Sequence, residues 1–589
     1  MRRQRNSAFI LLLGAFGVLT LIFGCANGES DDATDDDASG DVPRILGPDV
    51  DADDGADGVP DPDAEPPDPF DFVPPLVGPA IAGWEYILVP GEPAPDNPVK
   101  GAKTPDEYNV IPLFRFRPQQ DIDRGGPPRP VRTVFILMPG YSAGATQLFP
   151  MARWIVEQSQ GRVEVWVPDR RHALLEDQRG MDLAEELHDP WIAYDYYFRG
   201  ARIDGHRYVP LHPRGPKTDM MSEWGLDLWM RDLRRLVRIV PKSRRAANVV
   251  LGGDSRGALM AQTFAAWRFD DGVYGSEEIA GLVLWDGGYR PRTGMTESDY
   301  IKDLLAIRQG EKWRFEPVGL TGASLYMLEI LGMAIQDGFV DPNNPSLGSR
   351  GVFSERGPLE LLFPLLTRFR NITLTNEAML GMVIDSDTIP ANDFLAHAGK
   401  LSGGPVAHGL LGDYPTDPAS LYTWSYWDEC DPLELVDLKR AGRMFYEGPS
   451  NFTDPYYSAR LALDMDVAGW LETEGTWREN HFDISSARVD VPIFAISSAM
   501  WADSNQLDMY RTMIAPVRGQ TPGEEMGRDE FGFVRYVLPG WSHMDALMVE
   551  PEVNPMIPLV VEWLDDWTTG WTWVPRFGGG MTQAQSTGD

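Results

Sequence analysis

The sequence predicts an α/β protein in which a mostly parallel central sheet, flanked by helices, is interrupted by a large, mainly helical insertion. Residues 131–138 and 163–167 are short runs that are apolar on both faces, as strands buried in a parallel sheet are. Helical periodicity follows such runs, which is typical of right-handed strand–helix–strand units. This rhythm stops near Arg290 and returns with the apolar run that begins at Val491.

The expected elements follow from these patterns in chain order. Because apolar residues alternate or cluster there, the predicted strands are 84–90, 108–117, 131–138, 163–167, 248–251, 279–285, 491–497 and 533–538. The predicted core helices, from their helical spacing, are 147–158, 224–240, 255–269 and 555–568. Within the insertion, 298–307, 324–336 and 359–368 have helical spacing, and no strong strand is predicted. Apolar residues of the insertion, such as Met379, are expected to form the insertion's own core or to line a pocket.

The first 25 residues are typical of a signal peptide that ends in a lipidated cysteine. Arg2, Arg3 and Arg5 precede an apolar run that is too short to span a bilayer. The run ends in Leu-Ile-Phe-Gly-Cys, which resembles a bacterial lipobox with Cys25 as the lipidation site. The resemblance implies a protein anchored by lipid in the bacterial cell envelope, and Ala26 after the cysteine favours the outer membrane. An uncleaved N-terminal anchor is the alternative.

Residues 26–76 are expected to be an acidic, disordered linker. Asp, Ala, Gly and Pro dominate the segment, so it has too few apolar side chains to offset the entropy lost on folding. The expected organisation is therefore a signal peptide (1–25), this linker, a core of strands and helices (77–289 and 488–569), a cap or lid insertion (290–487) and a flexible tail (570–589).

Composition excludes one class of partner. The formal net charge is −36, and no dense Lys/Arg run lies beyond the N-terminus, so the chain lacks the basic surface that nucleic acid requires. The two cysteines, Cys25 and Cys430, cannot form an intrachain disulfide if Cys25 is lipidated. Zinc-ligand and dinucleotide-binding motifs are not found, so we expect no metal and no organic cofactor.

The strongest chemical signal is the pentapeptide Gly253-Asp254-Ser255-Arg256-Gly257, which fits G-x-S-x-G. In this motif a strand turns so sharply into a helix that the serine hydroxyl is exposed, and side chains on the flanking glycines would collide. An apolar strand precedes the pentapeptide and a helical pattern follows it. The sequence therefore predicts that Ser255 is a nucleophile at the N-terminal end of a helix, where free N–H groups favour negative charge.

A serine nucleophile needs a base, and the base needs an acid. Of the eight histidines, His543 lies in a loop after a late strand and before the terminal helix, so it is the predicted base. The preferred acid is Asp503, shortly after strand 491–497. Asp508 is an alternative, as is Asp286 at the end of the preceding strand. The chain order Ser, Asp, His is kept by each of them.

These motifs together resemble the α/β-hydrolase superfamily, in particular its capped esterase and lipase-like members. The resemblance covers about 131–287 and 492–568. It implies an oxyanion hole formed by the backbone N–H of Arg256 and by the loop after strand 131–138, where Tyr141 is the expected donor. This chain has Pro139-Gly140 where many relatives have His-Gly, but the donor is a backbone group.

The expected function is hydrolysis of carboxylic esters, small or lipid-like, through a Ser-His-Asp triad and an acyl-enzyme. A serine at position 255 argues against haloalkane and epoxide chemistry, for which relatives use aspartate. A peptidase or amidase on the same fold is one alternative, and a non-catalytic surface lipoprotein with a hydrolase-like fold is another.

Overall fold

The chain has 589 residues, and its computed structural model describes part of it. The described residues are 76–124, 129–211, 215–287, 296–315, 322–339, 372–388, 395–409, 412–426, 434–468, 484, 489–498, 527–528, 533–574, 577 and 583–586. All of them belong to one compact unit, Gly47–Asp589. The predicted signal peptide with Cys25, the linker and the helix at 359–368 lie outside the described residues.

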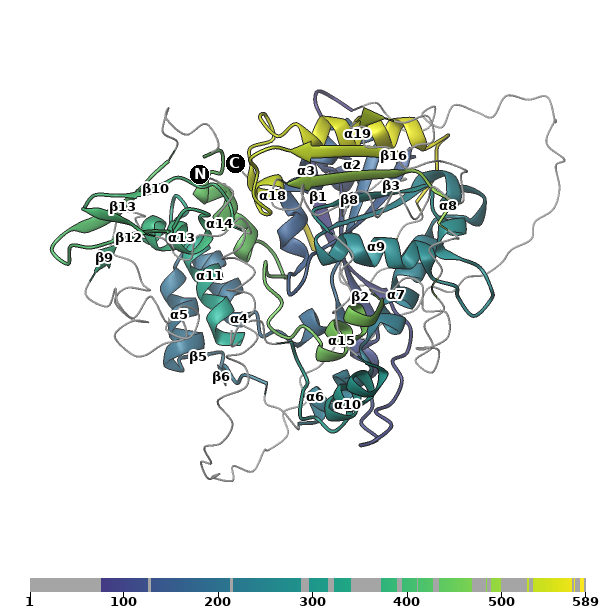
Figure 1. Cartoon of the computed structure of the whole chain (residues 1–589), viewed down its shortest axis with the longest axis horizontal. Coiled ribbons are helices and arrows are strands. Elements are labelled where there is room, and N and C mark those ends of the chain that lie inside the picture. The colour runs from purple at the N-terminus through teal and green to yellow at the C-terminus, as the bar shows by residue number, and fades with distance from the viewer. Residues whose placement is uncertain are drawn as a thin grey trace. The chain divides into compact units, whose positions relative to one another are not determined.

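A twisted, largely parallel sheet forms the centre of the described structure (Figure 1), in the order β15-β16-β14-β8-β7-β3-β4-β2-β1-β17. The strands from β16 to β4 run parallel, whereas β2, β1, β15 and β17 pair antiparallel at the two edges. Their bounds are β1 (Ala82–Pro90), β2 (Val110–Pro118), β3 (Thr133–Met138), β4 (Val163–Pro168), β7 (Val249–Asp254), β8 (Gly281–Trp285), β14 (Ile493–Ser498), β15 (Gly527–Arg528), β16 (Phe533–Leu538) and β17 (Gln583–Ser586).

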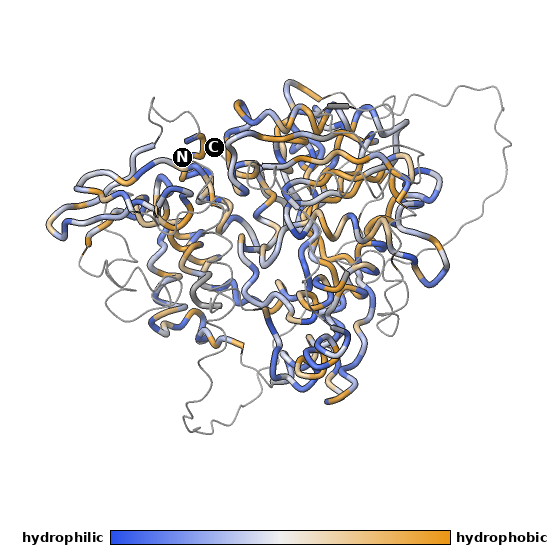
Figure 2. The backbone as a smooth tube through the Cα atoms, in the orientation of Figure 1, coloured by the Kyte–Doolittle hydropathy of each residue, from blue (hydrophilic) through white to orange (hydrophobic). Residues whose placement is uncertain are grey.

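Helices cover both faces of this sheet because its central strands are apolar on both sides. In β3, Val134 and Ile136 pack with α7 (Leu226–Ile239) and α9 (Arg256–Ala266). Phe135 and Leu137 point the other way, as alternating strand residues must, and join the core formed with α3 (Phe149–Gln158) and α19 (Met556–Trp567). Hydrophobic residues accordingly gather along the strands of the sheet (Figure 2).

The predicted α/β-hydrolase fold is thereby confirmed, and each predicted core strand is present within a few residues of its expected ends. The remaining short elements are η2 (Asp106–Tyr108), α2 (Gln119–Arg124), η3 (Ala145–Leu148), η4 (Arg171–Leu175), β5 (Arg202–Ile203), β6 (His206–Arg207), α6 (Pro216–Asp219), α8 (Lys242–Asn248), η6 (Gly275–Glu278) and α18 (Asp545–Met548).

Two parts of the structure differ from the sequence-based expectation. In the C-terminal segment, which was expected to be a flexible tail, β17 pairs with β1 at the edge of the sheet. The insertion also contains short strands besides its helices. They are β9 (Thr373–Leu374), β10 (Lys400–Ser402), β11 (Val406–Gly409), β12 (Gly412–Pro415) and β13 (Leu421–Ser425). Strands of two to five residues leave too little periodicity to be recognised in a sequence.

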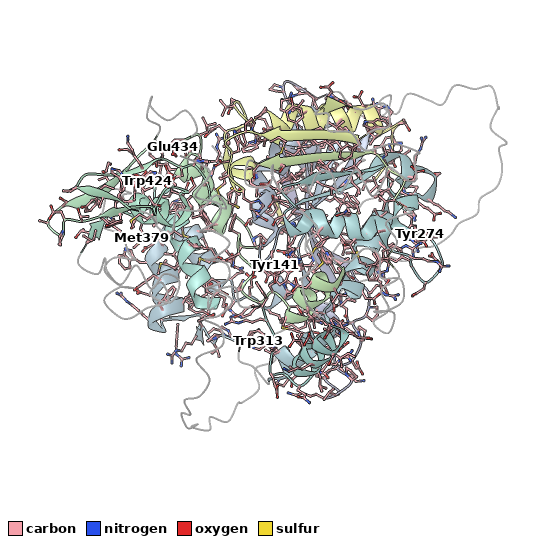
Figure 3. All side chains as sticks on the ribbon, in the orientation of Figure 1. Tyr141, Tyr274, Trp313, Met379, Trp424 and Glu434 are labelled. Carbon is pink, nitrogen blue, oxygen red and sulfur yellow. The ribbon has the colours of Figure 1, made fainter. Side chains whose placement is uncertain are left out.

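The insertion's helices pack partly on each other and partly on a pair of helices that lie between β4 and α7 in the chain. Helix α11 (Gly322–Ala334) contacts α14 (Leu438–Tyr446), α13 (Asn376–Ile384) and α5 (Pro190–Arg199), which pairs with α4 (Arg179–Leu187). Tyr197 stacks on Tyr326 at a centroid distance of 4.2 Å. Met379 and Trp424, labelled in Figure 3, are buried in this region, so they form the insertion's own core.

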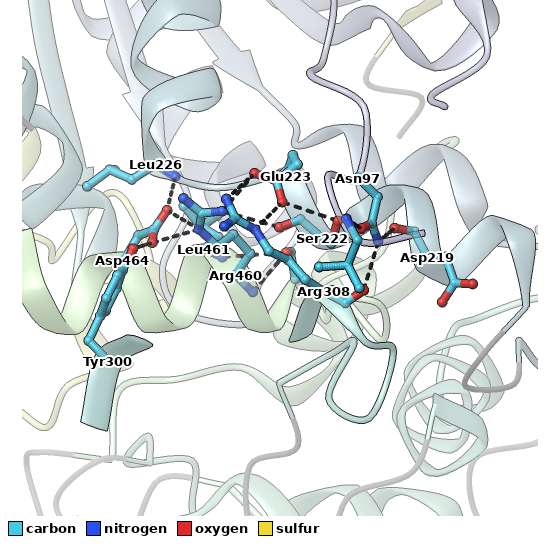
Figure 4. Close-up of polar contacts among 12 residues, drawn as sticks. Asn97, Asp219, Ser222, Glu223, Leu226, Tyr300, Arg308, Arg460, Leu461 and Asp464 are labelled. Atoms are coloured by element: carbon cyan, nitrogen blue, oxygen red, sulfur yellow. Dashed lines mark hydrogen bonds and ion pairs between the residues drawn. The ribbon is translucent and has the colours of Figure 1, made fainter. Parts of the chain in front are cut away.

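A buried polar cluster connects two helices of the insertion, α10 (Glu297–Arg308) and α15 (Ala459–Ala468), to the core (Figure 4). Asp464 of α15 accepts hydrogen bonds from the backbone N–H of Leu226, at the start of α7, and from the hydroxyl of Tyr300 in α10, at 3.0 and 2.8 Å. Arg460 pairs with both Asp464 and Glu223 of η5 (Met220–Glu223). The charges of this buried network are thus paired, as buried charges must be, and the network links α10 and α15 to the start of α7.

Candidate active site

Ser255 occupies the sharp turn between β7, which ends at Asp254, and α9, which begins at Arg256. Its backbone has φ 55° and ψ −118°, a region that residues with a Cβ avoid. Its N–H donates to the carbonyl of Trp285 at 3.0 Å, and its side chain is partly exposed. A serine held in a strained conformation at a strand-to-helix turn is the geometry that the sequence motif predicted.

The two glycines of the motif are required by close backbone packing. A Cβ on Gly253 would lie within 3.0 Å of the backbone of Gly257, and a Cβ on Gly257 would collide with the carbonyl oxygen of Met138. Gly140 approaches the nucleophile closely, because a Cβ there would lie 3.3 Å from the Cβ of Ser255. The turn and the loop after β3 therefore meet at the nucleophile, with no room for a side chain on Gly253 or Gly257 and a tight fit at Gly140.

His543 lies in the loop after β16 and is almost fully buried, with 1% of its surface exposed. Its Nδ1 is 2.9 Å from Oδ2 of Asp286, which directly follows β8. The other carboxylate oxygen of Asp286 accepts from the N–H of Ser498 at 2.6 Å, and the N–H of Asp286 donates to the carbonyl of Ile496 at 2.9 Å. Asp286 is thus fixed on both sides while it holds the imidazole.

Of the three candidate acids, the structure describes one. Asp286, the alternative from the earlier strand, is the described carboxylate that contacts Nδ1 of His543. Asp503, which was preferred from the sequence, and Asp508 both lie outside the described residues. Ser255, His543 and Asp286 all follow strands that end at the same edge of the sheet, since β7, β8, β14 and β16 run parallel.

A second carboxylate, which the sequence analysis did not single out, lies on the other side of the imidazole. Oδ2 of Asp254 is 3.9 Å from Nε2 of His543, and Asp254 is fully buried. Burial raises the pKa of Asp254 to about 7, although the nearby imidazole opposes the shift. Burial disfavours the imidazolium of His543, but Asp254 and then Asp286 favour it, and the net effect raises its pKa.

Replacing Asp254 with Asn is therefore expected to move the acid limb of the kcat/KM profile to lower pH. The base must be unprotonated to accept the serine proton, and the loss of one neighbouring carboxylate lowers the pKa of His543. The check is a profile of ester hydrolysis between pH 4 and 9. A limb that stays in place, or moves to higher pH, would contradict this electrostatic coupling.

The loop after β3 carries Tyr141, the expected oxyanion donor. The N–H of Gly140 donates to Oε1 of Gln147 at 2.8 Å, so this peptide is tied to the helical turn that follows the loop. The ring of Tyr141, labelled in Figure 3, packs on Phe315 at 4.2 Å, and the guanidinium of Arg256 lies 5.0 Å from its centroid. Nε2 of Gln147 also reaches Asp254 at 3.4 Å, so the side chain links this loop to the turn at Ser255.

A second histidine–carboxylate pair connects the insertion to the loop that carries His543. Nδ1 of His397 is 2.5 Å from Oδ2 of Asp545, and the N–H of His397 donates to Oδ1 of the same carboxylate at 2.7 Å. Asp545 also accepts from the N–H of Ser542 at 2.7 Å. Despite burial, Asp545, Glu434 and Asp385 together raise the pKa of His397 to about 9.

We expect His397→Gln to lower thermal stability most at acidic and neutral pH. The folded-state pKa of His397 is about 9, above its value of 6.5 in an unfolded chain, so its contribution is complete below pH 6.5 and is lost as the pH rises through 9. A charged hydrogen bond of this kind contributes about 2 kcal/mol. Melting temperatures of both proteins at pH 6 and pH 10 test this, because the difference at pH 6 should nearly vanish at pH 10. Equal differences at both values would count against it.

Two further observations concern the described residues alone. Among them, no group of three or more His, Cys, Asp or Glu side chains is arranged to bind a metal ion. Within the same part of the chain, no helix has both the length and the apolar character of a membrane span.

No family model and no curated protein matches the chain. Among solved structures, it is similar to a protein from Sulfolobus solfataricus assigned as a lipase, with 13% identity, a TM-score of 0.38, and coverage of 82% of this chain and 99% of that one. It is similar to an epoxide hydrolase from Vigna radiata, with 14% identity, a TM-score of 0.33 and coverage of 82% and 98%. A carboxyl esterase from Bacillus coagulans, with 11% identity, has a TM-score of 0.34 and the same coverage.

Proposed function

We propose that the protein is a serine hydrolase that cleaves carboxylic esters. The observation that carries the proposal is the 2.9 Å contact between His543 and Asp286 at the sheet edge where Ser255 occupies its strained turn. A serine hydroxyl is a weak nucleophile until a base removes its proton, and the base needs an oriented imidazole. The chain supplies a candidate for each of these roles.

In the proposed reaction, Oγ of Ser255 attacks the ester carbonyl carbon while Nε2 of His543 accepts the hydroxyl proton. Asp286 holds Nδ1–H of His543 and stabilises the imidazolium that forms. The N–H groups of Tyr141 and Arg256 donate to the oxyanion of the tetrahedral intermediate. The intermediate collapses to an acyl-enzyme as the imidazolium gives its proton to the departing alcohol. A water molecule that gives a proton to His543 then attacks the carbonyl carbon of the acyl-enzyme. This step releases the acid, and the proton returns to Oγ of Ser255.

Among acyl substrates, an ester makes the smaller demand on this set of groups. An alcohol leaves with less assistance from a general acid than an amine does, so cleavage of an amide would demand more of His543. Ser255 itself acts as the nucleophile, and the proposed steps use only side chains and backbone groups of this chain.

A fluorophosphonate probe tests the nucleophile directly. We expect the wild-type protein to be labelled covalently at Ser255 and Ser255→Ala to remain unlabelled. A panel of p-nitrophenyl esters of increasing chain length, compared with aminoacyl anilides, tests the bond. Preferential anilide cleavage would replace the ester proposal with a peptidase. A folded wild-type protein that neither labels nor turns over any substrate would indicate a non-catalytic protein.

We also propose that the enzyme is tethered to a membrane of the bacterial envelope through a lipid on Cys25. The basic, apolar and lipobox-like segments of the first 25 residues support this proposal. Expressed in a bacterial host, the wild-type chain should partition into the membrane fraction and incorporate labelled fatty acid, whereas Cys25→Ser should incorporate none. Fatty-acid labelling that persists in Cys25→Ser would contradict this site of lipidation.

A further inference from the structure

Arg170 directs its guanidinium at the backbone of the loop that follows β3. Its Nη2 donates to the carbonyl oxygens of Pro139 at 2.7 Å and Gly140 at 2.9 Å, and its Nη1 donates to that of Ala143 at 2.8 Å. Arg170 lies just after β4, the strand next to β3, and only 1% of its surface is exposed. Three carbonyls of one short loop thus converge on one buried cation.

The surroundings keep this cation buried and oriented. Its guanidinium lies 5.0 Å from the ring centroid of Tyr457 and 6.0 Å from that of Trp229, distances that suit cation–π contact. The carboxylate of Asp169 interacts with it electrostatically. A buried charge is costly unless it is hydrogen-bonded, and here the carbonyls of the loop provide those bonds.

The geometry of the peptide bond turns these contacts into control of an N–H direction. The carbonyl of Gly140 and the N–H of Tyr141 belong to the same planar, trans peptide and point in opposite directions. A guanidinium that holds the carbonyl of Gly140 therefore fixes where the N–H of Tyr141 points. The preceding peptide is fixed at both ends, since Arg170 holds the carbonyl of Pro139 while Gln147 holds the N–H of Gly140.

We propose that Arg170 is a positioning residue for the oxyanion hole, which aims the N–H of Tyr141 at the developing oxyanion and strengthens it as a donor. A cation on a carbonyl polarises the whole peptide, so the N–H at its other end becomes a stronger donor. The inference rests on the proposed hydrolase function, because it concerns an oxyanion that only acyl transfer forms.

The test compares Arg170→Met and Arg170→Lys with Arg171→Met as a matched control. Arg171 is the next residue and is equally buried, but its guanidinium pairs with Asp232 at 2.7 and 2.8 Å. Both methionine variants remove a buried cation, whereas only one removes the contacts to the loop. Melting temperature, kcat and KM with a p-nitrophenyl ester, and the affinity of a trifluoromethyl ketone are measured for each.

Arg170→Met is expected to lower kcat by about 10²- to 10³-fold, the effect of losing one oxyanion donor, with KM changed less than threefold. Affinity for the trifluoromethyl ketone, which forms a tetrahedral adduct with Ser255, should fall by the same factor as kcat/KM. Arg170→Lys, which keeps the charge but has fewer donors, should lose about tenfold. The kcat of folded Arg171→Met should stay within threefold of the wild type.

The inference is overturned if folded Arg170→Met keeps a wild-type kcat, if Arg171→Met loses as much activity, or if ketone affinity does not follow kcat/KM. Should Arg170→Met fail to fold, Arg170→Lys decides the matter, and unchanged activity in that variant overturns the inference. An inactive, unlabelled wild-type protein contradicts the proposed function itself, which separates that failure from the failure of this inference.

Discussion

Asp286→Asn is expected to lower kcat by about 10⁴-fold while leaving substrate binding nearly unchanged. The carboxylate accepts from Nδ1–H of His543, whereas the amide nitrogen of asparagine would face Nδ1 as a donor and favour the wrong tautomer. With the proton on Nε2, the imidazole can no longer accept the proton of Ser255. Steady-state hydrolysis of a p-nitrophenyl ester, with active sites titrated by the fluorophosphonate probe, measures the loss.

Two other variants show whether that loss is specific. Asp254→Asn removes the carboxylate near Nε2 of the same imidazole and should keep most of the activity at its own pH optimum. Asp503→Asn addresses the acid that the sequence favoured and should leave kcat within a few-fold of the wild type. If Asp503→Asn is inactive while Asp286→Asn remains active, the acid in the proposed triad is Asp503.

The choice between these two acids shows which part of the site could be predicted from the sequence. Both candidates were recognised because each follows a strand whose carboxyl end lies at the predicted catalytic edge. Spacing along the chain could not decide which one contacts His543, since that depends on strand register and on the path of the loop after β16. The structure sets Asp286 one residue beyond β8, where the N–H of Ser498 in the neighbouring strand β14 fixes one of its oxygens.

Local patterns predicted the strand-to-helix turn at Ser255 well, but they did not predict the side chains that position the neighbouring loop after β3. The turn at Ser255 depends on neighbours in the chain, so glycine spacing and the flanking strand and helix were sufficient to find it. Arg170 and Gln147 act on the loop after β3 through contacts between segments that are distant in sequence. A signal was present, because Arg170 follows the buried strand β4 at the same edge of the sheet. Its partners are backbone carbonyls, however, which carry no residue-specific pattern.

The insertion was the part that sequence patterns described least completely. Its helices α10 and α11 were predicted within two residues at each end, because they have clear helical spacing or a long apolar run. Its two-residue strand β9 pairs with β13 across nearly fifty residues of chain, and that pairing comes from tertiary packing rather than local preference. Helix α5, which lies before the insertion in the chain, packs on α11, and this is likewise a long-range contact.

Gly257→Ala is expected to destabilise the fold by about 3 kcal/mol or more and to reduce kcat strongly in any protein that folds. The added methyl group would collide with the carbonyl oxygen of Met138 and lie 3.0 Å from that of Pro139, and both are backbone atoms that cannot rotate away. Relief requires α9 and the end of β3 to separate. Because Pro139 leads directly into the loop that carries Tyr141, that separation would shift this proposed oxyanion donor relative to Ser255.

Gly409→Ala is the matched control, since Gly409 is exposed and its added methyl group would lie 3.1 Å from a ring carbon of Tyr414, which can shift, and no closer than 3.3 Å to backbone, at the carbonyl oxygen of Gly412. Melting temperature and kcat should fall together in Gly257→Ala and hardly change in Gly409→Ala. A Gly257→Ala protein with wild-type stability and activity would mean that the turn tolerates a Cβ at this position. In that case the tight contact between α9 and the loop after β3 would not be what holds Ser255 and its oxyanion donors together.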